Sequence, residues 1–300
     1  MFPTLVSTVF SVMTLAAPID TTVPAERGQR LEANVFGGEI IVKTWARNAV
    51  RLQADPSSRT EVTISSVGST IIVRSEGRRG PASAVDLNLT VPVWMALDLS
   101  GVYTDVTIDG VRASLEVETV QGDVEVTGGE GQVSLSSVQG SVTLRGAKGR
   151  IGVHSVNEDV RVMNTTGEIK AETVNGEIEL EKVDATNLDA NTVNGDVAYD
   201  GPIHDGGRYA LSSHNGDITI GMTPTTNATV AVSTFSGDFE SDFPVTIKNQ
   251  KKGKRFDFTL GRGGAQVELE SFQGTIRLVR PGTAASRQDH DNDDDRDTHP

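Results

Sequence analysis

A regular series of carboxylates is the feature of this sequence whose residue type and spacing best suit chemistry. These carboxylates follow equivalent turns that contain glycine except where Glu158 replaces it, and Ser141 takes the place of the carboxylate once. Carboxylate oxygens are preferred ligands of Ca²⁺. They also accept hydrogen bonds from the N–H groups of tight turns. We call this series the acidic column, and its members are Asp123, Asp159, Glu177, Asp196, Asp217 and Asp238.

Stacked turns would bring neighbouring carboxylates of the acidic column to within about 5 Å, the spacing between β-strands. At an effective dielectric constant near 20, two such charges repel by about 3 kcal/mol before salt screening. Two arrangements relieve this repulsion. Either the carboxylates accept turn N–H groups and extend into solvent, or a row of Ca²⁺ ions binds between them. The sequence contains no complete Ca²⁺ ligand set, which favours the first arrangement.

Other site chemistry finds little support in the sequence. There is no P-loop, nucleophile elbow, HExxH motif or dinucleotide-binding glycine pattern. The absence of cysteine excludes thiol catalysis and thiolate metal sites. The five histidines lack metal-ligand spacing, and His214 replaces a valine of the turn pattern as a tolerated substitution. We therefore expect no catalytic or cofactor-binding residues, and no cofactor other than the Ca²⁺ alternative.

Composition and charge limit the partners of this chain. It has 300 residues and a net charge of −14, from 27 Lys and Arg against 41 Asp and Glu. This negative charge disfavours non-specific binding to nucleic acid or to an anionic membrane. Sugar sites need aromatic platforms and paired acids, whereas Tyr103, Tyr199 and Tyr209 are scattered along the chain. A carbohydrate-active enzyme is therefore a weaker alternative than a binding protein.

A nine-residue period in the middle of the chain positions the acidic column. Apolar residues recur at this step, with a second apolar residue two places later, and this is the periodicity of β-strands. Alternate turns differ, so the full period is about 18 residues and holds two strands. The first apolar series is Val124, Val133, Val142, Ile151, Val160, Ile169 and Ile178.

This period predicts an all-β fold, a flattened parallel β-solenoid of about 18-residue coils with two strands per coil. A short turn cannot join two parallel neighbours, so each strand pairs with the strand one coil away. A triangular hexapeptide coil would bury Gln132, Arg150 and Glu168, which is costly. Turn amides should stack as a side-chain ladder at positions 121, 139, 157, 175, 194 and 215.

The chain ends differ from the repeats. Leu5 to Ala17 is too short to span a bilayer, which takes about 20 residues, and it resembles the apolar part of a secretory signal. The first basic residue is Arg27, so the positively charged start that is usual for a signal peptide is missing, and a buried first strand is the alternative.

The predicted organisation is a signal peptide over 1–16, a linker over 17–33, an N-terminal β cap over 34–100, solenoid repeats over 101–242, a C-terminal β cap over 243–281 and an acidic disordered tail over 282–300.

At this level the chain resembles a bacterial β-strand-repeat family of unknown function whose members are adhesin-like envelope proteins. The likeness rests on the segment 38–42 followed by Trp45, on the segment 89–92 (Leu-Thr-Val-Pro), and on the tandem Val-Asn-Gly-Asp/Glu turns. It covers roughly residues 34–281. The family resemblance implies an exported protein without a catalytic motif.

These observations predict an exported, non-enzymatic surface-interaction module in the periplasm, at the cell surface or in the medium. Its expected partner is a protein or glycan of the cell envelope, without nucleic acid and without a transmembrane segment in the mature chain. The alternative is a structural or sensory partner of an envelope regulator.

Overall fold

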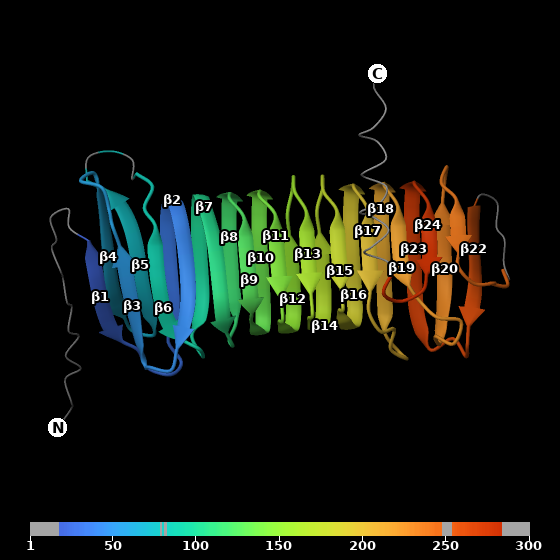
Figure 1. Ribbon diagram of the computed structural model, residues 1–300, viewed down its shortest axis with the longest axis horizontal. Coiled ribbons are helices and arrows are strands. Elements are labelled where there is room, and N and C mark those ends of the chain that lie inside the picture. The colour runs from blue at the N-terminus through green and yellow to red at the C-terminus, as the bar shows by residue number, and fades with distance from the viewer. Residues whose placement is uncertain (1–17, 79, 81–82, 248–253, 284–300) are drawn as a thin grey trace, which may run out of the picture.

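The computed structural model describes residues 18–78, 80, 83–247 and 254–283, and its regular structure in these ranges is entirely β-strand. The strands stack into one elongated body (Figure 1). No helix in the described ranges has the length and apolarity needed to cross a membrane. The predicted signal peptide and residues 284–300 of the predicted acidic tail lie outside these ranges.

Twenty-four strands form the body. The N-terminal strands are β1 (Ile19–Pro24), β2 (Arg30–Trp45), β3 (Ala49–Ala54), β4 (Thr60–Val67), β5 (Thr70–Gly77), β6 (Leu87–Pro92) and β7 (Ala96–Val111). The repeat strands are β8 (Leu115–Gln121), β9 (Val124–Gly128), β10 (Glu130–Gln139), β11 (Val142–Arg145), β12 (Lys148–His154), β13 (Val160–Met163), β14 (Thr166–Glu172), β15 (Ile178–Glu181), β16 (Asp184–Asn194), β17 (Val197–Asp200), β18 (Arg208–Asn215) and β19 (Ile218–Gly221). The last strands are β20 (Ala228–Thr234), β21 (Phe239–Ser241), β22 (Lys254–Leu260), β23 (Ala265–Gln273) and β24 (Ile276–Val279).

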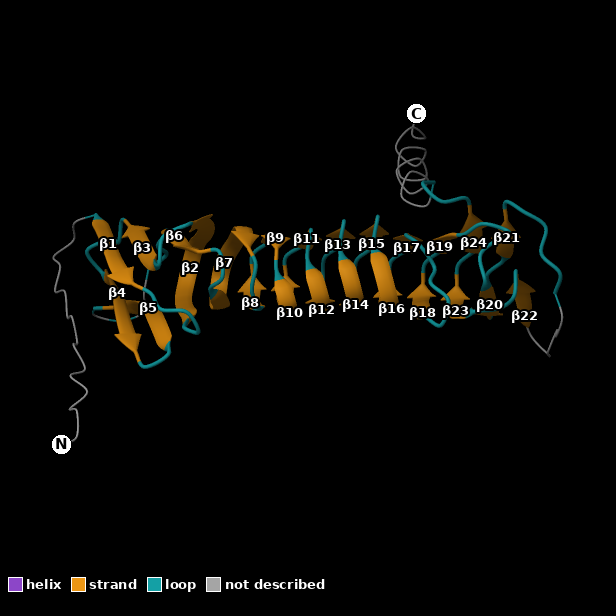
Figure 2. Ribbon diagram, turned by 90° about the horizontal axis from the view of Figure 1, so that it is seen from below, coloured by secondary structure: helices purple, strands orange, loops and turns teal. Residues whose placement is uncertain are grey.

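The strands form two facing ladders, seen as two rows in Figure 2. Strands one coil apart pair in parallel, as Val142 does with Val124 and with Val160. The predicted coil of about 18 residues with two strands is therefore confirmed. One ladder runs β4–β5–β2–β7–β8–β10–β12–β14–β16–β18–β23–β20–β22, and the other runs β1–β3–β6–β2–β7–β9–β11–β13–β15–β17–β19–β24–β21.

The apolar columns of the two ladders face each other and form one continuous core. In β9, for example, Val124 and Val126 are buried while Glu125 between them is exposed. Alternating inward positions are likewise filled by valine, isoleucine and leucine in most of the repeat strands, because successive side chains of a strand point to opposite faces. The core therefore extends along the whole solenoid.

The N-terminal end departs from sequence order. β2 is a complete coil that lies between the coil of β5 and β6 on one side and β7 on the other. β1 pairs antiparallel with β3, so the segment 17–33 contains a paired strand and the start of β2. The predicted linker over 17–33 was wrong, because Ile19 to Pro24 follow the edge of β3 and gain backbone hydrogen bonds there.

The C-terminal end also departs from sequence order. β23 pairs with β18 on one side and with β20 on the other, and β24 likewise pairs with β19 and β21. Residues 265–279 therefore form a regular coil inside the stack, and their prediction as part of a cap over 243–281 was wrong. The coil of β20 and β21 lies outside it. The antiparallel strand β22 then covers β20 and ends one ladder.

Close packing of the coils explains the turn glycines. A Cβ atom added to Gly195 would lie 2.0 Å from the carbonyl oxygen of Gly176, and Gly195 has φ +149°. Glu158 occupies the same place in its coil. There the regular pairing gives way to a hydrogen bond from the N–H of Glu158 to Oγ of Ser155, at 3.2 Å. The contact between stacked backbones therefore selects glycine as much as the φ angle does.

Candidate functional site

The most regular surface of the molecule is the edge formed by the turns that follow β8, β10, β12, β14, β16, β18, β20 and β23. We call it the turn edge. Each turn presents five residues in the same order, as in Thr119-Val120-Gln121-Gly122-Asp123. Because the coils stack in register, each position becomes a column along the solenoid. Four of these columns carry side chains.

The first is a buried column of hydroxyl groups, which sequence reasoning missed. Each hydroxyl donates a hydrogen bond of 2.8–3.0 Å to a backbone carbonyl of the preceding turn, as from Ser213 to Gly195. The signal was present in the sequence as Ser or Thr directly before the valine of each turn, or before His214 or Phe272 where these replace it. The donors are Thr119, Ser137, Ser155, Thr173, Thr192, Ser213 and Ser271.

The predicted amide ladder is present over four coils. Nδ2 of Asn175 donates to Oδ1 of Asn157 at 3.1 Å, and Nδ2 of Asn194 donates to Oδ1 of Asn175 at 2.8 Å. Nδ2 of Asn215 continues the series to Oδ1 of Asn194 at 2.7 Å. The ladder therefore ties neighbouring coils together on the outside of the turn edge.

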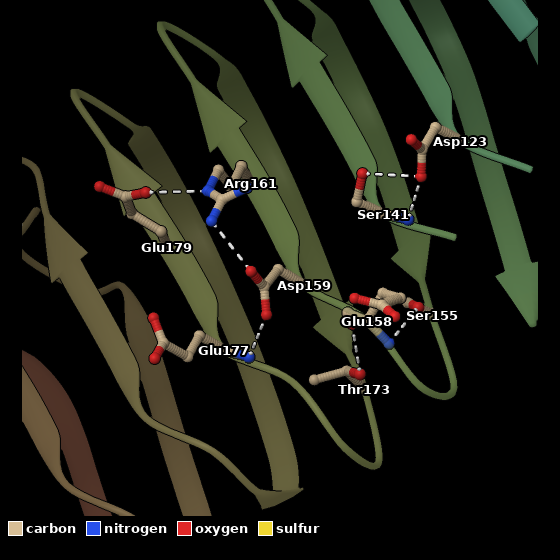
Figure 3. A network of polar contacts seen from close by, with 9 residues as sticks. All are labelled: Asp123, Ser141, Ser155, Glu158, Asp159, Arg161, Thr173, Glu177 and Glu179. Atoms are coloured by element: carbon tan, nitrogen blue, oxygen red, sulfur yellow. Dashed lines mark hydrogen bonds and ion pairs between the residues drawn. The ribbon is translucent and has the colours of Figure 1, made fainter. Parts of the chain in front are cut away.

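The acidic column uses its carboxylates in the same way (Figure 3). Oδ1 of Asp123 accepts the N–H of Ser141 at 2.7 Å, and Oδ1 of Asp159 accepts the N–H of Glu177 at 3.0 Å. Oδ1 of Asp196 accepts the N–H of Asp217 at 2.7 Å. The carboxylates thus bond to the next coil, and this supports the hydrogen-bonded arrangement expected from the sequence.

The structure changes both ends of the acidic column. Asp105 extends it, because Oδ1 of Asp105 accepts the N–H of Asp123 at 2.9 Å. At the other end, Asp217 is followed by Thr275, whose N–H it accepts at 2.6 Å. Asp238 belongs to the coil beyond Thr275, since β21 pairs with β24 and not with β19. The inserted coil therefore separates Asp238 from its predicted neighbour.

Electrostatics in the column differ from coil to coil. Arg161 pairs with Asp159 at 2.9 Å and with Glu179 at 3.4 Å (Figure 3). Glu177 lies between two other acids, and burial, followed by the charges of Asp159 and Asp196, raises its pKa above the ordinary value. Among the described residues, no three His, Asp or Glu side chains gather in a metal-binding group. The Ca²⁺ alternative thus stays a prediction, tested below.

The fourth column consists mainly of exposed apolar side chains. These residues stand at matching positions of ten stacked coils, and those in the middle are valines, such as Val193 with 43% of its surface exposed. At about 4.8 Å per coil the column is roughly 43 Å long. We call it the apolar ridge, and in spatial order it contains Phe36, Val102, Val120, Val138, Val156, Val174, Val193, His214, Phe272 and Phe235.

Aromatic rings occupy both ends of the apolar ridge. The rings of His214 and Phe272 stack with centroids 4.7 Å apart, and Phe272 stacks on Phe235 at the same distance. Phe235 is 73% exposed. At the other end, Phe36 packs edge-to-face against Tyr103. His214 is therefore part of an aromatic stack, which the sequence hid because Phe272 is 58 residues away.

Negative charge is concentrated on the repeats. Residues 101–242 hold 8 Lys and Arg against 23 Asp and Glu, so their net charge is 8 − 23 = −15, whereas the whole chain carries −14. The remaining residues together carry +1. The apolar ridge therefore runs along the most acidic part of the molecule.

The outer face of β12, β14, β16 and β18 carries a shallow groove of about 440 Å³. Two acids line it, but Glu168 pairs with Arg150 at 3.3 Å and Asp189 accepts a hydrogen bond from Asn191. No aromatic ring lines this groove. Two of the three tyrosines, Tyr199 and Tyr209, are buried in the core and present no ring to a sugar. The geometry gives the carbohydrate-active alternative little support.

The sequence profile of the Toastrack DUF4097 family matches residues 8–279. No curated protein matches the chain. One similar solved structure is described as a "putative cell adhesion protein" from Clostridium sporogenes, with 8% identity over 87% of this chain and 99% of that one, and a TM-score of 0.22. Another is described as a "putative adhesin" from Bacteroides fragilis, with 12% identity over 88% of this chain and 97% of that one, and a TM-score of 0.35.

Proposed function

Since the chain belongs to the Toastrack DUF4097 family, we propose that it is an exported, non-enzymatic β-solenoid that acts as an adhesin-like interaction module of the cell envelope. The apolar ridge is the observation that carries this proposal. Soluble proteins rarely expose long continuous apolar surfaces, and those that do use them to contact other molecules. A stack of hydrogen-bonded coils supplies a rigid support for such a contact.

Export and interaction are tested separately. Native cells are fractionated, and the N-terminus of the protein is sequenced. We expect a mature start near Ala17 in the periplasmic, surface or medium fraction. An intact Met1 in the cytoplasm would overturn the proposed export.

The interaction is tested with envelope extracts passed over the immobilised full chain. A matched column carries the variant Val174→Ser/Val193→Ser, which changes only exposed side chains of the apolar ridge. We expect the wild-type column to retain an envelope component that the variant column loses. Equal retention on both columns would contradict a role for the apolar ridge.

A further inference from the structure

We propose that the turn edge binds a cationic amphipathic α-helix of another polypeptide, laid along the solenoid axis. This inference rests on the proposed interaction function and names the chemistry of the partner. Three properties of the turn edge support it: the pitch of the apolar ridge, the charge beside it, and the aromatic stack at one end.

The pitch of the apolar ridge suits a helix better than a strand. Its side chains repeat about every 4.8 Å, the spacing of the stacked coils. An α-helix rises about 5.4 Å per turn and presents an apolar residue at each turn. Side chains on one face of an extended strand repeat about every 6.7 Å. A helix therefore slips by about 0.6 Å per turn against the coils and stays within half a coil spacing over about four turns, whereas a strand slips by about 1.9 Å per repeat and loses register within two coils.

The charge beside the apolar ridge selects a cationic partner. Each acid of the column stands three residues after a residue of the apolar ridge, so the acidic column runs parallel to the ridge along the same edge. Glu177 stands between Asp159 and Asp196, and all three are partly exposed. A lysine or arginine stripe flanking the apolar stripe of a helix would meet this column. Such charge complementarity raises both the specificity and the rate of association.

The same charge argues against two other occupants. A second copy of this chain would place one acidic column beside another, and like charges across an interface oppose binding. A membrane surface rich in anionic lipid would be repelled by repeats with a net charge of −15. The cationic helix is the occupant that satisfies both the apolar ridge and the acidic column.

The stack of His214, Phe272 and Phe235 supplies the anchor of this interface. Aromatic side chains contribute most where they bury large apolar area, and Phe235 is the most exposed large apolar side chain of the described residues. The outer ring edges continue the line of the valines. A helix covering the stack and the adjoining valines would bury the widest part of the apolar ridge.

The probe for this proposal is an 18-residue peptide of leucine and lysine, with leucine at helical spacing. A permuted peptide of the same composition serves as the control, because it carries the same charge without an apolar face. Binding to the full chain is measured by fluorescence anisotropy at 0.15 M salt, and helix formation by circular dichroism. We expect the helical probe to bind at least tenfold more tightly than the permuted peptide and to gain helicity.

Two ridge variants and one acidic variant locate the site. Val174→Ser/Val193→Ser and Phe235→Ser should each weaken binding of the helical probe at least fivefold, and Glu177→Gln about twofold. The matched control, Asp109→Asn/Glu130→Gln, removes two exposed acids from the opposite edge of the solenoid, near the end of β7 and the start of β10, and should change affinity less than twofold. Thermal unfolding of each variant checks that it remains folded. We expect Phe235→Ser to lower the stability least, because this side chain is mostly exposed.

Several outcomes would overturn the proposal. Equal affinity for the two peptides, or no effect of either ridge variant, would show a non-specific charge interaction. Binding to anionic or zwitterionic vesicles with loss in the ridge variants would assign the edge to a lipid surface. Concentration-dependent dimerisation that the ridge variants abolish would assign it to a second copy. Each of these results leaves the proposed export and envelope interaction untouched, because export is tested by fractionation and the envelope interaction by the extract columns.

Discussion

Asp123 and Ser141 are joined across two coils by a pair of hydrogen bonds. Oδ1 of Asp123 accepts the backbone N–H of Ser141 at 2.7 Å and its hydroxyl at 3.0 Å, although the residues are 18 apart in the chain. The same carboxylate-to-N–H bond recurs at other coils of the acidic column. The carboxylates of the acidic column therefore link neighbouring coils, as in the hydrogen-bonded arrangement that the sequence favours.

Two replacements of Asp123 distinguish the contribution of its hydrogen bond to stability from the contribution of its charge. Asp123→Ala leaves the N–H of Ser141 without its acceptor and should lower the free energy of unfolding by about 1–2 kcal/mol. Asp123→Asn keeps an acceptor oxygen and should stay within about 0.5 kcal/mol of wild type. Urea titration of both variants checks this. If asparagine destabilises as much as alanine, the charge and not the hydrogen bond holds the coils together.

Glu177 should make the stability depend on pH. Its pKa is raised in the folded state by burial and by the neighbouring acids. The ionised form therefore destabilises the fold at pH values above the raised pKa, and protonation removes this cost as the pH falls toward the ordinary pKa. Glu177→Gln should raise the free energy of unfolding at pH 7 by about 0.2–1 kcal/mol, the size of a like-charge pair on a sheet.

The gain from Glu177→Gln should vanish below the ordinary pKa of a glutamate, where the wild-type side chain is also neutral. Glu125→Gln, an exposed position on β9, is the matched control and should show little change at either pH. Unfolding measured at pH 7 and at pH 4 compares the two variants. A gain that persists unchanged at low pH would contradict the electrostatic origin.

Calcium distinguishes the two arrangements of the acidic column. Because its carboxylates already accept backbone N–H groups, we expect millimolar Ca²⁺ to shift the Tm of the full chain by less than about 1 °C, which corresponds to at most about 0.5 kcal/mol. Mg²⁺ at the same concentration controls for ionic strength. A larger shift specific to Ca²⁺, and lost in Asp196→Asn, would restore a row of Ca²⁺ ions between the carboxylates of the acidic column from Asp123 to Asp217.

Two glycines, Gly195 in a turn and Gly152 on strand β12, should respond differently to replacement by alanine. Gly195→Ala places a methyl group 2.0 Å from the carbonyl oxygen of Gly176 and should cost about 3 kcal/mol or more, since stacked backbone must move. Gly152→Ala on β12 meets no atom within 4 Å and should be neutral or slightly stabilising. Similar effects of the two substitutions would contradict the close-approach explanation.

The buried tyrosine pair should stabilise the widened coil near residues 201–207. The hydroxyl of Tyr199 donates to the carbonyl oxygens of Val183 and Pro202, at 3.1 and 2.9 Å. Burial raises the pKa of this phenol above its ordinary value, so the hydroxyl remains a donor at neutral pH. Tyr199→Phe should cost about 1–3 kcal/mol in urea unfolding. Tyr103→Phe, at an exposed site, should cost much less.

The sequence by itself determined the coil and its columns. The nine-residue spacing of Val124, Val133 and Val142 specifies two strands per coil, because side-chain alternation has a period of two and any slip would expose the core. The glycine, amide and carboxylate at each turn then stack without further information. The coil can be predicted from the sequence because each coil interacts mainly with its nearest neighbours, so the same residue pattern recurs in each.

Only the tertiary structure decided the order of the coils at the two ends. β2 lies between the coil of β5 and β6 and the coil of β7, and residues 265–279 lie between two coils that precede them in the chain. This insertion separates Asp238 from Asp217 and brings Phe272 between His214 and Phe235. The physical reason is that every parallel coil presents the same backbone hydrogen-bonding edge, whatever its place in the chain. The fit of the edges and side chains in the folded state therefore decides which coils become neighbours.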